Sequence, residues 1–234
     1  MQGQLFSQNF LTSGVLETPP YRDLDAATFS AFKAALRDIF QGFDCGSSAL
    51  NEAQTESEAI DKTLAALGWE DTLPQVNLSS KGRKDVPDRL LFADKAHKTA
   101  ALAEKNNAQC YRHGIVILEA KRWMRPLDRS DVTYATDPDA PSSQMLRYLS
   151  RAEVMSDRAI KWGILTNGAL WRLYWQDARS RAEEFFEIDL ASALELPGTQ
   201  PGLDDLDGDE ALKLFLLFFG RPAFQERTLT TRYQ

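Results

Sequence analysis

The chain has few of the residues on which several enzyme classes depend. Of its 234 residues, two are histidines and two are cysteines, and Cys45 and Cys110 stand far apart with no metal-ligand spacing. Two histidines are too few for a histidine-based metal centre, and they argue against histidine-dependent nucleases and catalytic triads. Two distant cysteines fit a reduced protein without disulfides, which predicts a cytoplasmic location.

Long apolar runs and nucleotide-binding loops are also lacking. No apolar stretch approaches the length of a membrane span, and the N-terminal residues show no signal-peptide pattern, so we expect no membrane partner. The chain contains neither the G-x-x-x-x-G-K-[ST] loop of nucleotide motors nor the G-x-S-x-G turn of serine hydrolases. The sequence therefore argues against both of these classes.

Charge is distributed unevenly along the chain. The formal net charge is −7, which argues against a protein that coats DNA over its whole surface. Residues 81–129 nevertheless contain 12 Lys/Arg and 6 Asp/Glu, a local balance of +6 that leaves −13 for the other residues. A solvated, lysine-rich loop would explain this pattern, and so would a site that receives an anionic backbone.

Hydrophobic periodicity predicts an α/β fold. An extended arm, Leu5 to Tyr21, precedes the expected helices, which cover residues 26–43, 52–67, 142–156 and 211–219. The helix at 142–156 is expected to be capped by Ser142 or Ser143. We expect strands over residues 75–92, 113–121, 162–166, 169–175 and 183–188, and Asn167-Gly168 predicts a tight hairpin turn. This order predicts an α/β sandwich with a central mixed β-sheet flanked by helices.

The same pattern divides the chain into three segments. Residues 1–48 are expected to form an arm and a helix that pack on the core, and residues 49–195 the core itself. Residues 196–234 read as an acidic loop and a C-terminal helix that leads toward a possible following domain.

Two short motifs carry the candidate chemistry. Pro87-Asp88 lies toward the end of the strand expected at 75–92, and Glu119-Ala120-Lys121 closes the apolar run of residues 114–118. A continuous apolar run indicates a central strand covered on both faces, and charges that emerge from such a strand usually have a function. A strand that ends in Glu and Lys for solubility is the alternative interpretation.

These residues suit a hard divalent cation. Mg²⁺ (or Mn²⁺) prefers oxygen ligands, which Asp88, Glu119 and the backbone carbonyl of Ala120 could supply. A bound metal lowers the pKa of its water and offsets the charge of a phosphate. Lys121 shares a strand face with Glu119 because side chains alternate, so it could orient or deprotonate the attacking water.

The interval between the two motifs is the weak point of this hypothesis. Asp88 and Glu119 are separated by 31 positions, so the polar stretch at 94–112 must loop out between two sheet strands. If that stretch belongs to the core instead, Asp85 or Asp94 takes the place of Asp88.

A polar helix face adds a further candidate surface. Gln144, Arg147, Tyr148 and Arg151 fall at i, i+3, i+4 and i+7 of the predicted helix at 142–156. This face could contact a DNA backbone or brace the catalytic lysine. An ordinary solvated helix face would show the same spacing.

Taken together, these motifs resemble those of the PD-(D/E)XK nucleases. The resemblance rests on Pro87-Asp88, on Glu119-Ala120-Lys121 and on the Gln144–Tyr148 segment, which is similar to a Q-x-x-x-Y motif. It is strongest toward the N-terminal nuclease domains of fused restriction–modification enzymes of type IIG, and type I restriction subunits are more distant. It covers roughly residues 50–190.

The resemblance implies a restriction-endonuclease-like fold and a Mg²⁺-dependent DNA endonuclease. It assigns metal binding and catalysis to Asp88 and Glu119, and metal binding to the backbone carbonyl of Ala120. It also assigns catalytic roles to Lys121 and to Glu56 on the helix expected at 52–67, where Glu52 is the second choice. Supporting or DNA-contacting roles would fall to Gln144, Tyr148, Arg147 and Arg122. The implied partners are double-stranded DNA and the methyltransferase and target-recognition domains of the same or a partner chain.

Two other functions remain open from the sequence. One is a non-catalytic DNA-binding or assembly module that retains the nuclease fold, whose acidic surface outside residues 81–129 would dock onto a protein. The other is a repair or phage-type exonuclease, which would not cut circular DNA.

Overall fold

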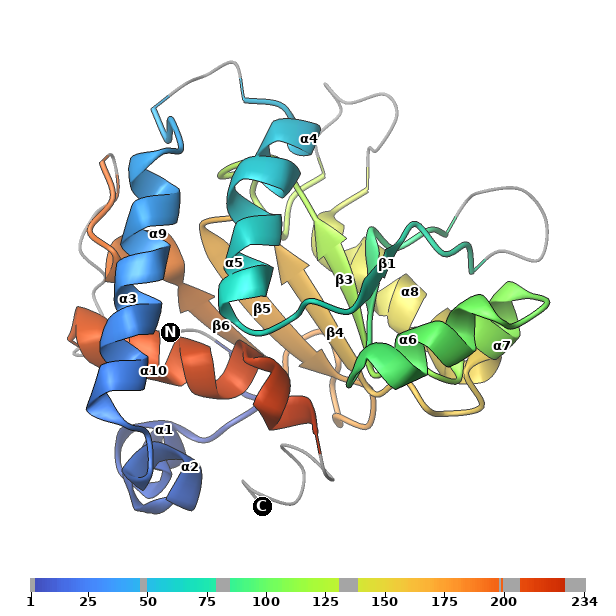
Figure 1. Cartoon of the computed structure of the whole chain (residues 1–234), viewed down its shortest axis with the longest axis horizontal. Coiled ribbons are helices and arrows are strands. Elements are labelled where there is room, and N and C mark those ends of the chain that lie inside the picture. The colour runs from blue at the N-terminus through green and yellow to red at the C-terminus, as the bar shows by residue number, and fades with distance from the viewer. Residues whose placement is uncertain are drawn as a thin grey trace.

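The fold is a mixed β-sheet between two layers of helices (Figure 1). The computed structural model describes residues 3–46, 50–78, 85–130, 139–197, 199 and 207–225. Within these residues the sheet has six strands in sequence order, which confirms the predicted α/β sandwich with a mixed sheet. The strands are β1 (Thr72–Pro74), β2 (Arg89–Leu91), β3 (Val116–Ala120), β4 (Trp162–Thr166), β5 (Leu170–Trp175) and β6 (Phe185–Asp189).

The pairing of β3 with β4 determines where the strand ends meet. These two strands run parallel, whereas all other neighbouring pairs in the described sheet are antiparallel. A parallel pair needs a crossover connection, and helix α8 (Pro141–Met155) lies between β3 and β4 in the chain. The carboxyl ends of β3 and β4 therefore lie side by side, at the top of the sheet beside α4 in Figure 1.

The helices form one layer on each face of the sheet. Helices α3, α5 and α10 cover the face toward the viewer in Figure 1, and α6, α7 and α8 pack with the side chains of the opposite face. A π-helical segment, Glu56–Ile60, joins α4 to α5, so the predicted helix at 52–67 is confirmed. The remaining bounds are α1 (Gln8–Thr12), α2 (Pro19–Arg22), α3 (Ala26–Gln41), α4 (Glu52–Thr55), α5 (Asp61–Ala66), α6 (Lys95–Leu102), α7 (Asn107–Tyr111), α9 (Leu190–Ala193) and α10 (Gly208–Phe219), with 3₁₀ turns at Gly14–Glu17 and Arg221–Phe224.

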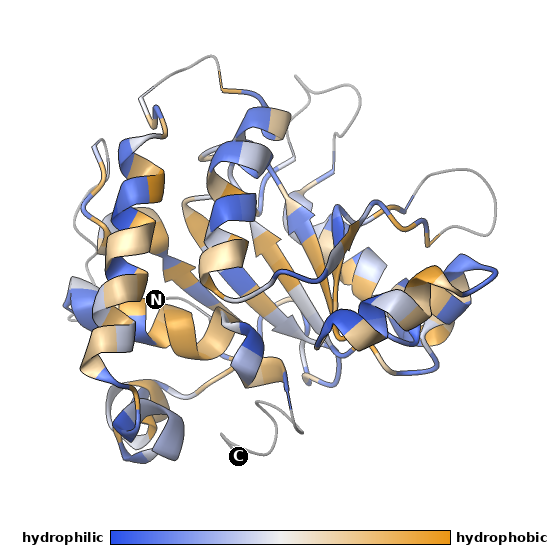
Figure 2. Cartoon of the chain, in the orientation of Figure 1, coloured by the Kyte–Doolittle hydropathy of each residue, from blue (hydrophilic) through white to orange (hydrophobic). Residues whose placement is uncertain are grey.

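Each face of the sheet has its own hydrophobic core, and the strands are predominantly apolar (Figure 2). The larger core joins Leu36, Ile60, Trp171 and Phe215, so the described parts of all three predicted segments share it. The smaller core packs α8 against the other face. Among the described residues, no helix is long and apolar enough to cross a membrane, and both cysteines are free.

The N-terminal arm is the clearest departure from the predicted elements. Residues 5–21 are not extended but form α1, a 3₁₀ turn and the start of α2. The Ser7 side chain accepts a hydrogen bond from the Phe10 N–H, and Pro19 begins α2, where a missing N–H costs nothing. Caps and prolines create these short helices without the hydrophobic period on which the prediction relied.

Strand lengths and caps differ in smaller ways. Of the strand expected at 75–92, only residues 89–91 are assigned to β2, and residues 79–84 lie outside the described part. The 94–112 stretch does leave the sheet, as α6 and α7. Helix α8 begins at Pro141 with Ala140 as its N-cap, so the predicted serine cap is wrong.

The hairpin between β4 and β5 is confirmed, with a different turn. Gly168 has a positive φ of 83°, whereas Asn167 is not among the residues with positive φ. The Asn167 side chain instead accepts hydrogen bonds from the N–H groups of Ala169 (3.0 Å) and Leu170 (2.7 Å). Asn167 therefore closes this turn through its side chain rather than through its backbone conformation.

Candidate active site

Strand β3 places Glu119 and Lys121 on the face that α8 covers. Leu118 packs in the core on the other face and Ile117 in the core with α8, so alternation puts residues 119 and 121 on the α8 side. Only 3% of Glu119 and 2% of Lys121 are exposed. Two ionisable side chains are thus buried at the end of a central strand, where burial of an unpaired charge is costly.

The two side chains pair with each other. Lys121 Nζ donates a hydrogen bond to Glu119 Oε1 at 2.7 Å. The backbone N–H of Lys121 donates to the Thr166 carbonyl at 2.8 Å, which extends the ladder between β3 and β4 by one residue. The strand end that carries both groups is therefore held by the neighbouring strand.

Asp88 joins this pair across the sheet. Arg89 lies opposite Leu118 in the β2–β3 register, and continuation of that register sets Asp88 opposite Glu119. Asp88 Oδ2 accepts a hydrogen bond from the backbone N–H of Ala120 at 2.8 Å. Strand pairing thus brings together two residues that are far apart in the chain.

The two fallback residues lie elsewhere. Asp85 is buried in ion pairs with arginines of α8. Asp94 caps α6 and accepts a hydrogen bond from the His97 N–H at 2.9 Å. Asp88 is therefore the aspartate of the three that lies beside Glu119.

The electrostatics of the two carboxylates are unusual. Burial raises the pKa of Glu119 well above its usual value, the charge of Asp88 raises it further, and Lys121 opposes both. Burial likewise raises the pKa of Asp88, against its hydrogen bond from Ala120. Glu119 Oε2 is buried and has no hydrogen-bond partner within the described part of the chain. Two such carboxylates need a proton or a cation between them.

A divalent cation fits this arrangement. Mg²⁺ takes oxygen ligands and keeps several waters, so one or two carboxylates suffice on the protein side. Asp88 and Glu119, including the Glu119 oxygen without a partner, would hold the ion together with the backbone carbonyl of Ala120. The described residues contain no group of three or more His, Cys, Asp or Glu side chains that could hold a metal. Mg²⁺ keeps several water ligands, which would add to the protein oxygens.

Glu56 lies near Asp88 but is paired with an arginine. Arg89 Nη2 lies 2.5 Å from Glu56 Oε1 and 3.0 Å from Asp61 Oδ2, so one guanidinium binds two carboxylates of the same continuous helix. Burial raises the pKa of Glu56 to about 7, and the charge of Asp88 adds to this effect. Glu56 therefore exchanges its proton near neutral pH.

A buried hydrogen bond fixes the helix that carries Glu56. Thr55 is fully buried, and its Oγ1 accepts a hydrogen bond from the Trp123 N–H at 2.9 Å. This bond ties the helix to the loop that follows Lys121. Glu56 itself opens the π-helical segment, a wide turn that is frequent at functional sites.

The polar face of α8 divides into a buried part and an exposed part. Gln144 Nε2 donates to the Tyr148 hydroxyl at 2.8 Å, and both side chains are buried. The Val86 N–H also hydrogen-bonds to this hydroxyl, and burial, with the charge of Glu119, raises the pKa of Tyr148 to about 12. Gln144 and Tyr148 thus brace the segment before Asp88 instead of facing solvent.

The arginines of this helix pair with Asp85, three residues before Asp88. Arg147 and Arg151 are partly exposed and form ion pairs with Asp85. Arg122 is partly exposed and directly follows Lys121, and its carbonyl accepts a hydrogen bond from the Arg125 N–H at 3.1 Å.

One buried arginine near the site escaped the sequence prediction. Arg172 on β5 is 2% exposed and bonds to Glu187 (Nε to Oε2, 2.8 Å) and Asp128 (Nη1 to Oδ1, 2.7 Å). Asp128 belongs to the loop after Lys121, so Arg172 anchors that loop to the sheet. The detectable signal was the pairing of Arg172 with Glu187 on adjacent predicted strands.

Comparison of the chain with protein-family models, with curated proteins and with solved structures finds no match. The geometry of the site and the sequence motifs are therefore the basis for inferring function.

Proposed function

We propose that this chain is a Mg²⁺-dependent DNA endonuclease domain that hydrolyses phosphodiester bonds, the cleavage part of a restriction–modification enzyme. The observation that carries the proposal is buried Glu119 beside half-buried Asp88 on the adjacent strand. Glu119 Oε2 has no hydrogen-bond partner within the described chain, and Lys121 Nζ lies 2.7 Å from Glu119 Oε1. A structural ion pair needs only one carboxylate beside the lysine. The second carboxylate, Asp88, gives a divalent cation a further oxygen ligand from the protein.

Each residue has a defined task in this hypothesis. A metal ion held by Asp88 and Glu119 would supply a bound water of lowered pKa and neutralise charge on the scissile phosphate. Lys121, kept in place by Glu119, orients the attacking water and stabilises the negative charge that develops on the phosphate. Glu56, with its pKa of about 7, accepts or returns a proton near the site.

The surrounding residues position these groups. Gln144 and Tyr148 support the chain before Asp88, and Arg172 holds the loop after Lys121. Double-stranded DNA is the proposed substrate. Sequence specificity would come from target-recognition and methyltransferase domains in the same chain or in a partner chain.

The test is cleavage of supercoiled plasmid DNA in Mg²⁺ or Mn²⁺. The wild-type chain should produce nicked or linear DNA, and Glu119→Gln, Asp88→Asn and Lys121→Met should each lose activity by roughly 10²-fold or more. Asp177→Asn is the matched control, because it also removes one carboxylate but lies in a surface ion pair with Lys161 and Arg158. Equal activity of Glu119→Gln and the control would exclude the proposed site.

A non-catalytic DNA-binding or assembly module is the second candidate. The charge of −13 outside residues 81–129 favours it, since an acidic surface suits docking onto a basic protein. DNA binding without cleavage in any divalent metal, also when partner domains are supplied, would support this module. Cleavage that requires free DNA ends would instead indicate an exonuclease.

A further inference from the structure

A second charged cluster lies on helix α8, outside the carboxylate pair of the proposed site. Arg147 Nε contacts Asp85 Oδ1 at 2.8 Å, and Arg151 pairs with the other Asp85 oxygen. The Asp85 side chain is only 2% exposed, whereas the side chains of Arg147 and Arg151 are 38% and 46% exposed. One buried carboxylate therefore carries two arginines whose outer parts reach solvent.

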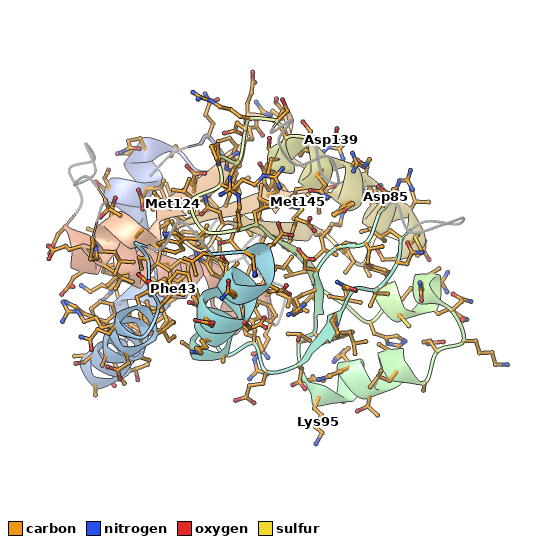
Figure 3. All side chains as sticks on the ribbon, turned by 90° about the horizontal axis from the view of Figure 1, so that it is seen from above. Phe43, Asp85, Lys95, Met124, Asp139 and Met145 are labelled. Carbon is orange, nitrogen blue, oxygen red and sulfur yellow. The ribbon has the colours of Figure 1, made fainter. Side chains whose placement is uncertain are left out.

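Arg147 has a second acidic partner of a different kind. Its Nη1 contacts Asp139 Oδ2 at 3.0 Å, and the Asp139 side chain is 56% exposed. The Asp139 carbonyl also accepts a hydrogen bond from Arg125 Nη2 at 3.3 Å. In Figure 3, Asp139 and Asp85 both lie along α8, with Asp139 toward one end of the helix. Three arginines thus meet two aspartates, a local charge of +1 on a chain whose net charge is −7.

The two aspartates differ in how easily another anion could replace them. Asp85 is buried and contacts both guanidinium groups, so its removal would leave a gap in the interior and two arginines without their shared counter-ion. Asp139 forms an exposed ion pair, a type that contributes little to stability. Asp85 is therefore a permanent counter-ion of Arg147, and Asp139 is an exchangeable one.

The position of the cluster suits a phosphate near the proposed cleavage site. Asp85 precedes Asp88 by three residues, and three residues of extended chain span at most about 10 Å. Arg147 is adjacent to Tyr148, whose hydroxyl hydrogen-bonds to Val86. An anion on Arg147 would therefore lie within a few nucleotides of a phosphate at Glu119, because each strand rises about 3.4 Å per nucleotide. A guanidinium presents a fork of donors that matches phosphate oxygens.

We propose that Arg147 and Arg151 bind a DNA phosphodiester within a few nucleotides of the phosphodiester that is cut, and that the bound phosphate displaces Asp139 from Arg147. The inference rests on the proposed function and names the surface that receives the substrate. Asp85 fixes both guanidinium groups before DNA arrives, so less side-chain freedom is lost on binding. In the absence of DNA, Asp139 pairs with Arg147.

The test is equilibrium binding of a short fluorescent DNA duplex to the full chain, with divalent metal removed by chelation. Asp139→Asn should lower Kd by roughly two- to five-fold, because the competing carboxylate is lost. Asp177→Asn is the matched control, since it changes the net charge by the same amount in another surface pair. Equal tightening by the two variants, or weaker binding by Asp139→Asn, would overturn the proposal.

Arginine variants provide the second arm. Arg147→Gln should raise Kd by roughly 10-fold and flatten the dependence of log Kd on log salt by about one phosphate contact. Arg158→Gln, which removes an arginine that is 64% exposed in another ion pair, should have little effect. Asp139→Asn carries the test if Arg147→Gln fails to fold, because Asp139 lies at the surface.

The outcomes separate this inference from the proposed function. If the wild-type chain cuts DNA but Asp139→Asn and Arg147→Gln bind it as the wild type does, the phosphate site is wrong and the nuclease hypothesis stands. If both variants shift Kd as expected but no metal supports cleavage, the DNA surface stands and the nuclease hypothesis is wrong. A wild-type chain that does not bind DNA would overturn the phosphate site.

Discussion

Two buried pairs of opposite charge lie on the same face of the sheet, and they differ in how well they are satisfied. Arg172 bonds to Glu187 and Asp128 and lies over the Phe185 ring at 3.9 Å. The Lys121–Glu119 pair is as deeply buried, yet one Glu119 oxygen has no hydrogen-bond partner in the described chain. The Asp88 carboxylate, a second negative charge, lies beside Glu119.

This comparison distinguishes structural charge from candidate chemistry. A buried charge that serves stability should have all its hydrogen bonds made, as Arg172 does. A site that receives a ligand stays incomplete until the ligand arrives, and it reduces the stability of the empty protein. The following predictions test this difference, in order of expected size.

The largest effect should be on cleavage. Glu119→Gln should lower the cleavage rate by roughly 10²- to 10⁴-fold, whereas Glu187→Gln should leave it within a few-fold of wild type. Both variants replace a buried glutamate on the same sheet, so initial rates on supercoiled DNA compare the two sites directly. If Glu187→Gln proves as damaging as Glu119→Gln, the separation of roles is wrong.

Stability should respond in the opposite way. Arg172→Met leaves Glu187 buried without its cation, so the free energy of unfolding should fall by about 3 kcal/mol or more. Burial raises the pKa of Glu187 as well, but that of Glu119 is raised well above its usual value, so Glu119 takes up a proton more readily. Lys121→Met should therefore cost less, about 1 kcal/mol. Urea denaturation of the two variants measures both values. A larger loss in Lys121→Met would show that the lysine is structural.

Glu56, near the proposed site, and Asp128, beside Arg172, should make contributions to stability that depend on pH in opposite ways. The pKa of Glu56 is raised to about 7, so the stability it contributes is complete below about pH 4.5 and is lost as pH rises through 7. Between pH 4.5 and 7, the free energy of unfolding of the wild-type chain should fall by about 1–2 kcal/mol relative to that of Glu56→Gln. One pKa unit corresponds to about 1.4 kcal/mol, and the partial exposure of Glu56 reduces the effect.

Asp128 provides the contrasting group. Its hydrogen bond to Arg172 lowers the pKa of its carboxyl below 3.8, so its contribution is present above that value and is lost as pH falls further. Metal-free urea denaturation at a series of pH values would therefore show Glu56→Gln deviating from wild type near neutral pH and Asp128→Asn deviating in acid. The same pH profile for both variants would contradict the prediction.

The smallest effect should be stabilisation by metal. At a few-fold excess over Kd, Mg²⁺ should stabilise the wild-type chain by roughly 1 kcal/mol. Glu119→Gln and Asp88→Asn should lose this response, and Glu187→Gln should keep it. Thermal unfolding with and without Mg²⁺ provides the measurement, with Ca²⁺ as a second oxygen-seeking cation.

The sequence predicted the parts of the site that depend on local pattern. The apolar run before Glu119 identified the central strand, and alternation correctly put Lys121 on the same face. The position of Asp88 depends on the pairing of β2 with β3, two strands separated by α6 and α7, and sequence periodicity does not determine that pairing.

Other features could not be obtained from local pattern. Helical spacing groups Gln144 with Arg147, but only the packing of α8 on the sheet shows that the first is buried and the second reaches the surface. The ion pairs of Arg147 and Arg151 with Asp85 join residues that are distant in the chain, and so does the bond between Arg172 and Asp128. Positions within one strand or helix were therefore more predictable than the contacts between distant parts of the chain.

The π-helical turn at Glu56–Ile60 has a consequence for how this site could change in evolution. A π turn amounts to one extra residue in an α-helix, and each residue of an α-helix turns the chain by about 100°. Loss of a single codon between 56 and 60 would leave Leu64 and the rest of α5 in the core. The same loss would rotate Glu52 and Thr55 away from the strand ends and break the bond to Trp123. A deletion of one residue could therefore keep the fold and remove the contacts that position this helix at the proposed site.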